Sequence, residues 1–179
     1  MHRLFVAIRP PETIRDQLLD LMEGVDSARW QDDEQLHLTV RFIGEVDRPT
    51  ADDIAATLAT VHQPAFEVAL SGVGHFGSGS HPHALWAGVR PPEPLAHLHK
   101  KVDQALIRIG LEPERRAYRP HITIARLSRR AGSISTFLEG HAAFSSAPFA
   151  VNSFGLYESR LSQAGAAYEL IERYPLQKD

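Results

Sequence analysis

Apolar residues recur along this chain at two spacings, and the spacing separates predicted strands from predicted helices. Runs of β-branched, aliphatic and aromatic residues predict strands at 3–8, 28–30, 36–43, 66–70, 84–89, 121–127, 149–157 and 168–174. Apolar residues three or four positions apart predict helices at 12–22, 50–61, 94–109 and 133–138. A capping-box pattern at 50–53 sets the start of the second helix, and the Gly, Ser and His residues of 72–83 predict a loop or a hairpin turn.

The two halves of the chain repeat the same order of patterns. Three pairs of segments match: 2–12 with 83–93, 37–40 with 121–124, and 66–72 with 149–155. Because the matches are collinear and nearly equally spaced, they predict an internal duplication, with halves of approximately 1–80 and 81–179 in one domain spanning 1–179. We expect an α+β fold of two pseudo-symmetric lobes, each a mainly antiparallel sheet with outer helices, and an active-site cleft between them.

The clearest repeat is the pattern His, apolar, Thr, apolar, which occurs once in each half. Alternate residues of a strand share a face, so His37 lies beside Thr39, and His121 lies beside Thr123. The apolar residues of both motifs then face a core. A pseudo-two-fold axis would bring equivalent strands to opposite walls of one cleft, which predicts that both His-Thr pairs face the same ligand.

Two imidazoles beside one ligand suit displacement at phosphorus. Imidazole has an ordinary pKa of about 6.5, so near neutral pH one ring can act as a base and the other as an acid. Each such proton transfer contributes roughly 10²–10⁴-fold to the rate. The threonine hydroxyls can donate to phosphate oxygens, and Arg126, which follows the second motif, can add a bidentate contact.

Composition narrows the alternatives. The 179 residues include no cysteine, so disulfides, thiolate nucleophiles and cysteine metal sites are excluded. The formal net charge of −3 argues against coating long duplex nucleic acid but permits a local basic pocket. His81 and His83 have no third ligand at a recognisable spacing, so we predict no metal site. We find no signal peptide and no apolar run that would span a bilayer, and we expect a cytoplasmic protein.

The paired motifs and their flanks resemble the two-histidine (2H) phosphoesterase superfamily, and within it the LigT-like RNA 2′,3′-cyclic phosphodiesterases. One His-x-Thr is a weak signal, whereas the pair with these flanks is specific and the resemblance covers nearly the whole chain. The matching flanks are Leu4-Phe5-Val6-Ala7-Ile8, Arg41-Phe42-Ile43-Gly44, Tyr118-x-Pro120 and Leu156-Tyr157-x-Ser159-x-Leu161.

The resemblance implies hydrolysis of a 2′,3′-cyclic phosphate at an RNA end to a 2′-phosphate, without a metal or another cofactor. By motif match, His37 would be the general acid that protonates the leaving O3′, and His121 would be the general base that activates water. The implied substrate-binding residues are Thr39, Thr123, Arg126 and Phe42. The partners would be RNA ends or nucleoside 2′,3′-cyclic phosphates. Separately from the resemblance, we expect a monomer, no membrane association and no obligate protein partner.

Two questions stay open at this level. Strict alternation puts Phe42 and Arg126 on the faces opposite the histidines, so they reach the ligand only if each strand twists, bulges or ends there. The same residues also suit a 2′-5′ RNA ligase, a 2′,5′-phosphodiesterase or a nucleotide-binding module without catalysis. Intact His and Thr in both motifs favour catalysis.

Overall fold

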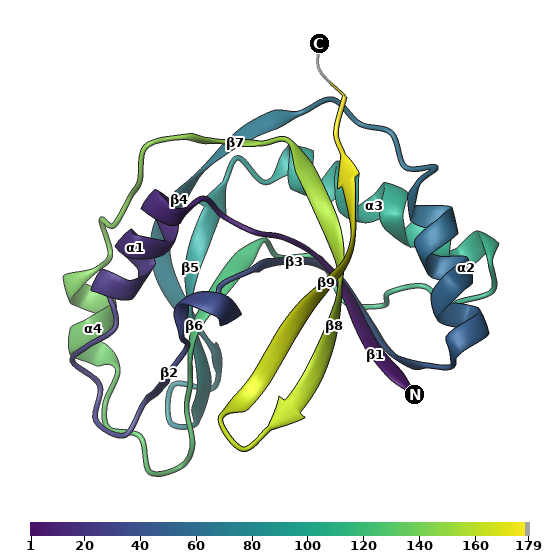
Figure 1. Cartoon of the computed structure of the whole chain (residues 1–179). Coiled ribbons are helices and arrows are strands. Elements are labelled where there is room, and N and C mark those ends of the chain that lie inside the picture. Colours follow the sequence, from purple (N-terminus) through teal and green to yellow (C-terminus); the bar gives the residue numbers. More distant parts are fainter. Residues whose placement is uncertain (178–179) are drawn as a thin grey trace.

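The computed structural model describes residues 1–177 as two antiparallel sheets with helices on either side (Figure 1). The strands are β1 (His2–Ile8), β2 (Arg29–Trp30), β3 (Leu38–Val46), β4 (Phe66–Gly77), β5 (Pro82–Arg90), β6 (His121–Arg126), β7 (Phe149–Val151), β8 (Ser153–Ser162) and β9 (Gly165–Pro175). The helices are α1 (Glu12–Asp20), α2 (Arg48–Leu58), α3 (Glu93–Arg108) and α4 (Ser135–Gly140), with a 3₁₀ turn η1 (Asp33–Gln35). The predicted α+β class is confirmed.

Each sheet is built from both halves of the chain. The four-stranded sheet has the order β3-β1-β8-β9, and the five-stranded sheet has the order β2-β6-β5-β4-β7. The series β3-β1-β8 therefore corresponds to β6-β5-β4, and in each series the third strand comes from the opposite half. Neither half completes its sheet alone. The first half supplies β4 to the five-stranded sheet and the second half supplies β8 to the four-stranded sheet, and this exchange of strands joins the two sheets.

Helices cover the outer sides of the molecule. Helix α3 contacts β3, and α2 contacts both α3 and β1, so this pair packs on the four-stranded sheet. Helices α1 and α4 lie on the opposite side, beside the five-stranded sheet (Figure 1). The apolar residues of both motifs enter the core, as predicted: Leu38, Val40, Ile122 and Ile124 are at most 1% exposed. No helix within residues 1–177 is long and apolar enough to cross a membrane.

Of the two alternatives predicted for 72–83, the hairpin turn is confirmed and the loop is wrong for most of that range. Strand β4 continues to Gly77 and pairs with β5, which leaves only a short turn between them. Gly74 is required within the strand because Trp86 crosses it. A Cβ at this position would lie 2.3 Å from the Trp86 ring. Here glycine marks a close approach between strands rather than a loop.

Two further differences from the predicted boundaries have a clear structural cause. Helix α2 begins before the predicted capping box, because the carboxylate of Asp47 accepts from the backbone amide of Thr50 at 2.9 Å and caps the helix. The predicted strand 149–157 divides at Asn152 into β7, which pairs with β4, and β8, which pairs with β1. This division lets one segment join both sheets.

Candidate active site

A β-bulge follows the threonine of the first motif and changes which residues share a face with it. Thr39 pairs with Ala7 and Phe42 pairs with Phe5, although Phe5 and Ala7 are only two positions apart on β1. Directly paired residues of an antiparallel sheet point to the same side. Phe42 therefore lies on the face of Thr39, and the expectation from strict alternation is wrong at this position.

An equivalent bulge follows the threonine of the second motif. Residues Gly88, Trp86 and Ala84 of β5 share a face, and they pair with His121, Thr123 and Arg126 in turn. Arg126 therefore lies on the face of His121, again against strict alternation. The two bulges occupy matching places in the two motifs. They gather the six predicted site residues on one face of each sheet.

His37 lies between η1 and β3, in a ring of aromatic side chains on the four-stranded sheet. The centroid of its imidazole is 4.7 Å from that of Tyr157, 5.4 Å from Tyr168 and 6.2 Å from Phe5. Burial, followed by the positive charge of Arg9, lowers the pKa of His37 to about 4. The backbone of Gln35 opposes this shift, although no described group makes a hydrogen bond of ordinary geometry with Nδ1. The ring is consequently neutral at pH 7 in the unliganded protein.

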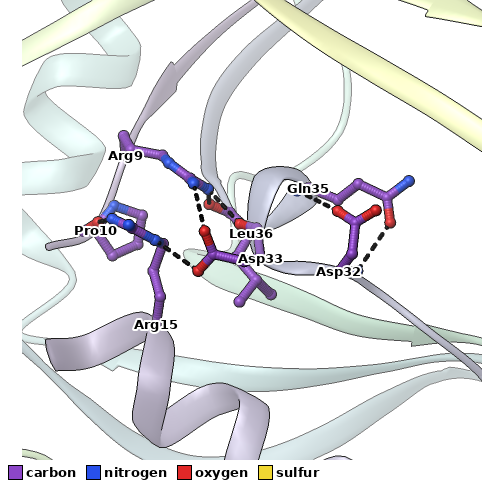
Figure 2. Close-up of polar contacts among 7 residues, drawn as sticks. All are labelled: Arg9, Pro10, Arg15, Asp32, Asp33, Gln35 and Leu36. Atoms are coloured by element: carbon purple, nitrogen blue, oxygen red, sulfur yellow. Dashed lines mark hydrogen bonds and ion pairs between the residues drawn. The ribbon is translucent and has the colours of Figure 1, made fainter. Parts of the chain in front are cut away.

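Arg9 and Arg15 hold the turn that leads into His37 (Figure 2). Arg9 Nη1 donates to the carbonyl oxygens of Asp33 and Leu36 at 2.6 and 2.8 Å. Arg15 Nε donates to Asp33 Oδ1 at 2.9 Å. Because Leu36 directly precedes His37, these contacts fix the backbone from which the imidazole projects. Arg9 was not among the site residues predicted from the sequence. The available signal was its spacing. Arg9 follows Phe5 and Ala7 at intervals of two residues, so it is expected on the same face as these residues, just after the end of β1.

His121 begins β6 on the five-stranded sheet, between Phe76 and Trp86, whose ring centroids are 4.8 and 6.2 Å away. Its Nδ1 donates to the carbonyl oxygen of Arg119 at 2.6 Å. Burial is the main cause that lowers the pKa of His121, and the charge of Arg126 adds to it. Since a carbonyl oxygen only accepts, Nδ1 carries the proton in the neutral ring and Nε2 carries the lone pair. This tautomer suits a general base.

Direct contacts join the two motif segments. Strands β3 and β6 approach within 8 Å between Cα atoms. Tyr118, which precedes the second motif, donates its hydroxyl to the carbonyl oxygen of Thr39 in the first motif at 3.0 Å. His99 stacks on Tyr118 with centroids 4.4 Å apart and donates from Nδ1 to the carbonyl oxygen of Val40 at 2.7 Å. Burial raises the pKa of Tyr118, so its hydroxyl remains a donor.

The charge of Arg126 affects titratable groups on both sheets. It lowers the pKa of His121, and it opposes the rise that burial causes in the pKa of Tyr168, the neighbour of His37. Phe42 is 61% exposed, and its centroid is 6.0 Å from that of Phe5. An exposed ring at this place is available to stack on a base.

The sequence model of the 2′-5′ RNA ligase superfamily matches residues 9–163. The chain belongs to this superfamily. An RNA 2′,3′-cyclic phosphodiesterase from Archaeoglobus fulgidus is 28% identical over 93% of this chain and 96% of its own length. Another protein of that name, from Aeropyrum pernix, is 31% identical over 78% of this chain and 81% of its own length. Escherichia coli LigT complexed with NADP⁺ superposes with a TM-score of 0.81 and 27% identity, over 99% of this chain and 98% of LigT.

For a member of the 2′-5′ RNA ligase superfamily, the site offers a specific set of chemical groups. It has two neutral imidazoles, two threonines, an exposed arginine and an exposed phenylalanine, arranged on two neighbouring sheets. Within residues 1–177, no group of three or more His, Cys, Asp or Glu side chains is arranged to hold a metal ion. The groups present can transfer protons, donate hydrogen bonds to phosphate and stack on a base.

Proposed function

We propose that this protein is an RNA 2′,3′-cyclic phosphodiesterase that opens a terminal 2′,3′-cyclic phosphate to a 2′-phosphate. The observation that carries the proposal is the doubled site. Each sheet presents one histidine and one threonine, and in both sheets the strand has a bulge directly after the threonine. Family membership and the names of the relatives support it. The proposed partners are RNA ends, bound by a cytoplasmic monomer.

His121 is the proposed general base. With Nδ1 held by the carbonyl oxygen of Arg119, Nε2 takes a proton from water as the water oxygen attacks phosphorus. The bond from phosphorus to O3′ breaks, and protonated His37 gives its proton to O3′. The product has a 3′-hydroxyl and a 2′-phosphate, and the two histidines exchange one proton through solvent before the next cycle.

His37 can act as an acid only after an anion binds. Its lowered pKa leaves it neutral at pH 7 in the free protein. A phosphodiester anion next to the ring stabilises the imidazolium form and raises this pKa toward the working pH. Substrate binding therefore favours protonation of His37, the general acid. Without substrate the ring stays neutral, and no buried cation is formed.

The remaining site residues are proposed to bind substrate. Thr39 and Thr123 donate hydrogen bonds to the non-bridging phosphate oxygens, and Arg126 neutralises the charge that builds up there in the transition state. Phe42 stacks on the terminal base. Thr39 and Thr123 share the faces of the histidines by strand alternation, and the bulges bring Phe42 and Arg126 to the same faces.

The test is turnover of adenosine 2′,3′-cyclic phosphate with excess chelator, followed by phosphorus NMR. We expect a 2′-phosphate product and a loss of at least about 10²-fold in His37→Ala and in His121→Ala. His97→Ala, at an exposed position on α3, is the matched control and should retain full activity. Near-native turnover in both site variants, a 3′-phosphate product or complete loss with chelator would contradict the mechanism. Joining of RNA ends without hydrolysis would favour the ligase, and nucleotide binding without turnover would favour a binding module.

A further inference from the structure

A pocket of about 250 Å³ lies beside Tyr157 and shares Arg9 and Arg15 with the surroundings of His37. Three arginines line it: Arg9, Arg15 and Arg173. The pocket is on the same face of the four-stranded sheet as His37, since Ala7 pairs with Gly155, and Gly155 pairs with Arg173. A Cβ at Gly155 would lie 2.7 Å from the end of Leu170 and 2.8 Å from the Tyr157 ring, so glycine leaves room for these two lining side chains.

Tyr157 belongs both to this pocket and to the surroundings of His37. Its ring meets the imidazole in a T-shaped contact with centroids 4.7 Å apart, and it lines the pocket. Arg9 and Arg173 act on the phenol, because both charges oppose the rise that burial causes in its pKa. An anion in the pocket and a phosphate beside His37 would therefore both lie next to this one aromatic side chain.

The pocket has more positive charge than its neighbours neutralise. Arg9 and Arg15 share a single carboxylate, that of Asp33. Within residues 1–177, no carboxylate lies within 4.0 Å of the guanidinium of Arg173. In a protein with a net charge of −3, such a concentration of arginine favours the binding of an anion.

We propose that the arginine pocket binds the phosphate on the 5′ side of the terminal nucleoside, the one that joins this nucleoside to the rest of an RNA strand. The proposal rests on the function proposed above, which puts the cyclic phosphate beside His37. Consecutive phosphates of one strand are separated by one nucleoside, and the two places border the same tyrosine, Tyr157. Phosphate contacts of this kind set the register of a nucleic acid on a protein. The preferred substrate is then an oligonucleotide end rather than a mononucleoside cyclic phosphate.

The experiment compares kcat/KM for three substrates: adenosine 2′,3′-cyclic phosphate, the same compound with a 5′-phosphate, and the dinucleotide ApA ending in a 2′,3′-cyclic phosphate. We expect both compounds with a 5′-side phosphate to be preferred, and the preference to weaken as salt rises. Arg173→Gln should lower the preference about tenfold, the value of one charge-assisted contact at a partly exposed site. Arg108→Gln, which removes an equal charge from the outer helix α3, should leave all three values unchanged.

Three kinetic outcomes would overturn the proposal. The first is equal kcat/KM for all three substrates in the wild-type protein. The second is an equal effect of Arg173→Gln and Arg108→Gln, which would show only a general response to net charge. The third is a preference for the dinucleotide without a preference for the 5′-phosphorylated mononucleotide. This result would assign recognition to the second nucleoside and would contradict the proposal.

A binding arm separates this proposal from the proposed function. Calorimetry compares the affinities for adenosine 2′-phosphate and for ApA with a terminal 2′-phosphate. If no substrate is turned over, the proposed function fails. Tighter binding of the dinucleotide that Arg173→Gln removes would still support the pocket, and equal affinities would refute it.

Discussion

The buried imidazole of His37 predicts a specific pH dependence of stability. An unfolded histidine has a pKa of about 6.5, and in the folded protein the pKa of His37 is about 4. Above pH 6.5 the ring is neutral in both states and contributes no pH-dependent term. As the pH falls from 6.5 to 4, the unfolded chain takes up a proton that the folded protein refuses, so the free energy of unfolding decreases.

The magnitude follows from the size of the shift. One pKa unit corresponds to about 1.4 kcal/mol, so the full shift of His37 costs about 3 kcal/mol of stability once the pH is below 4. Replacement by glutamine removes this cost, because glutamine does not titrate. His37→Gln should therefore gain about 3 kcal/mol relative to wild type between pH 7 and pH 4, on top of any constant change from altered packing against Tyr157.

Urea denaturation of both proteins at several pH values from 7 to 4 measures this difference. Groups such as Asp33, Glu158 and His121 titrate in both proteins and cancel in the comparison. His97→Gln provides the control, since its side chain is exposed and its stability curve should run parallel to that of wild type. Parallel curves for His37→Gln and wild type would refute the argument that burial keeps this ring neutral.

Three further predictions use other measurements. Adenosine 2′-phosphate should raise the pKa of His37 measured by NMR by at least about one unit, and an unchanged pKa would show that no phosphate binds beside this ring. Tyr118→Phe should lose about 1 kcal/mol of stability and lower kcat/KM, because it deletes the donor to Thr39, and unchanged values would mean that this bond does not join the motifs. Gly74→Ala should cost about 1–3 kcal/mol and shift tryptophan fluorescence by displacing Trp86, whereas a wild-type melting curve would contradict the close approach.

Local patterns were sufficient to predict the fold class and the contents of each motif. Alternation placed Leu38 and Val40 in the core and His37 beside Thr39, because these relations depend only on the period of a strand. The repeat indicated two similar sheets. It did not indicate that β4 and β8 would each pair within the sheet of the opposite half, since the choice of pairing partner depends on contacts between distant segments.

The bulges explain what sequence analysis could not predict about the site. Whether Phe42 shares a face with Thr39 depends on how β3 registers against Phe5 and Ala7 of another strand. The same holds for Arg126 against β5. The sequence of one strand contains no signal for an extra unpaired residue. Phe42 and Arg126 were therefore expected on the wrong face. The arginine pocket was missed for a related reason, because it combines residues from both ends of the chain.

The most direct test of the account is a double-mutant cycle on His37 and His121. Single-turnover rates with adenosine 2′,3′-cyclic phosphate are measured for His37→Ala, His121→Ala and the double variant. If both imidazoles act on one phosphate, each single change should lose at least about 10²-fold and the double variant should be little slower than the slower single variant. Losses that multiply in full, or a single variant with near-native rate, would show that the two histidines do not work as one site.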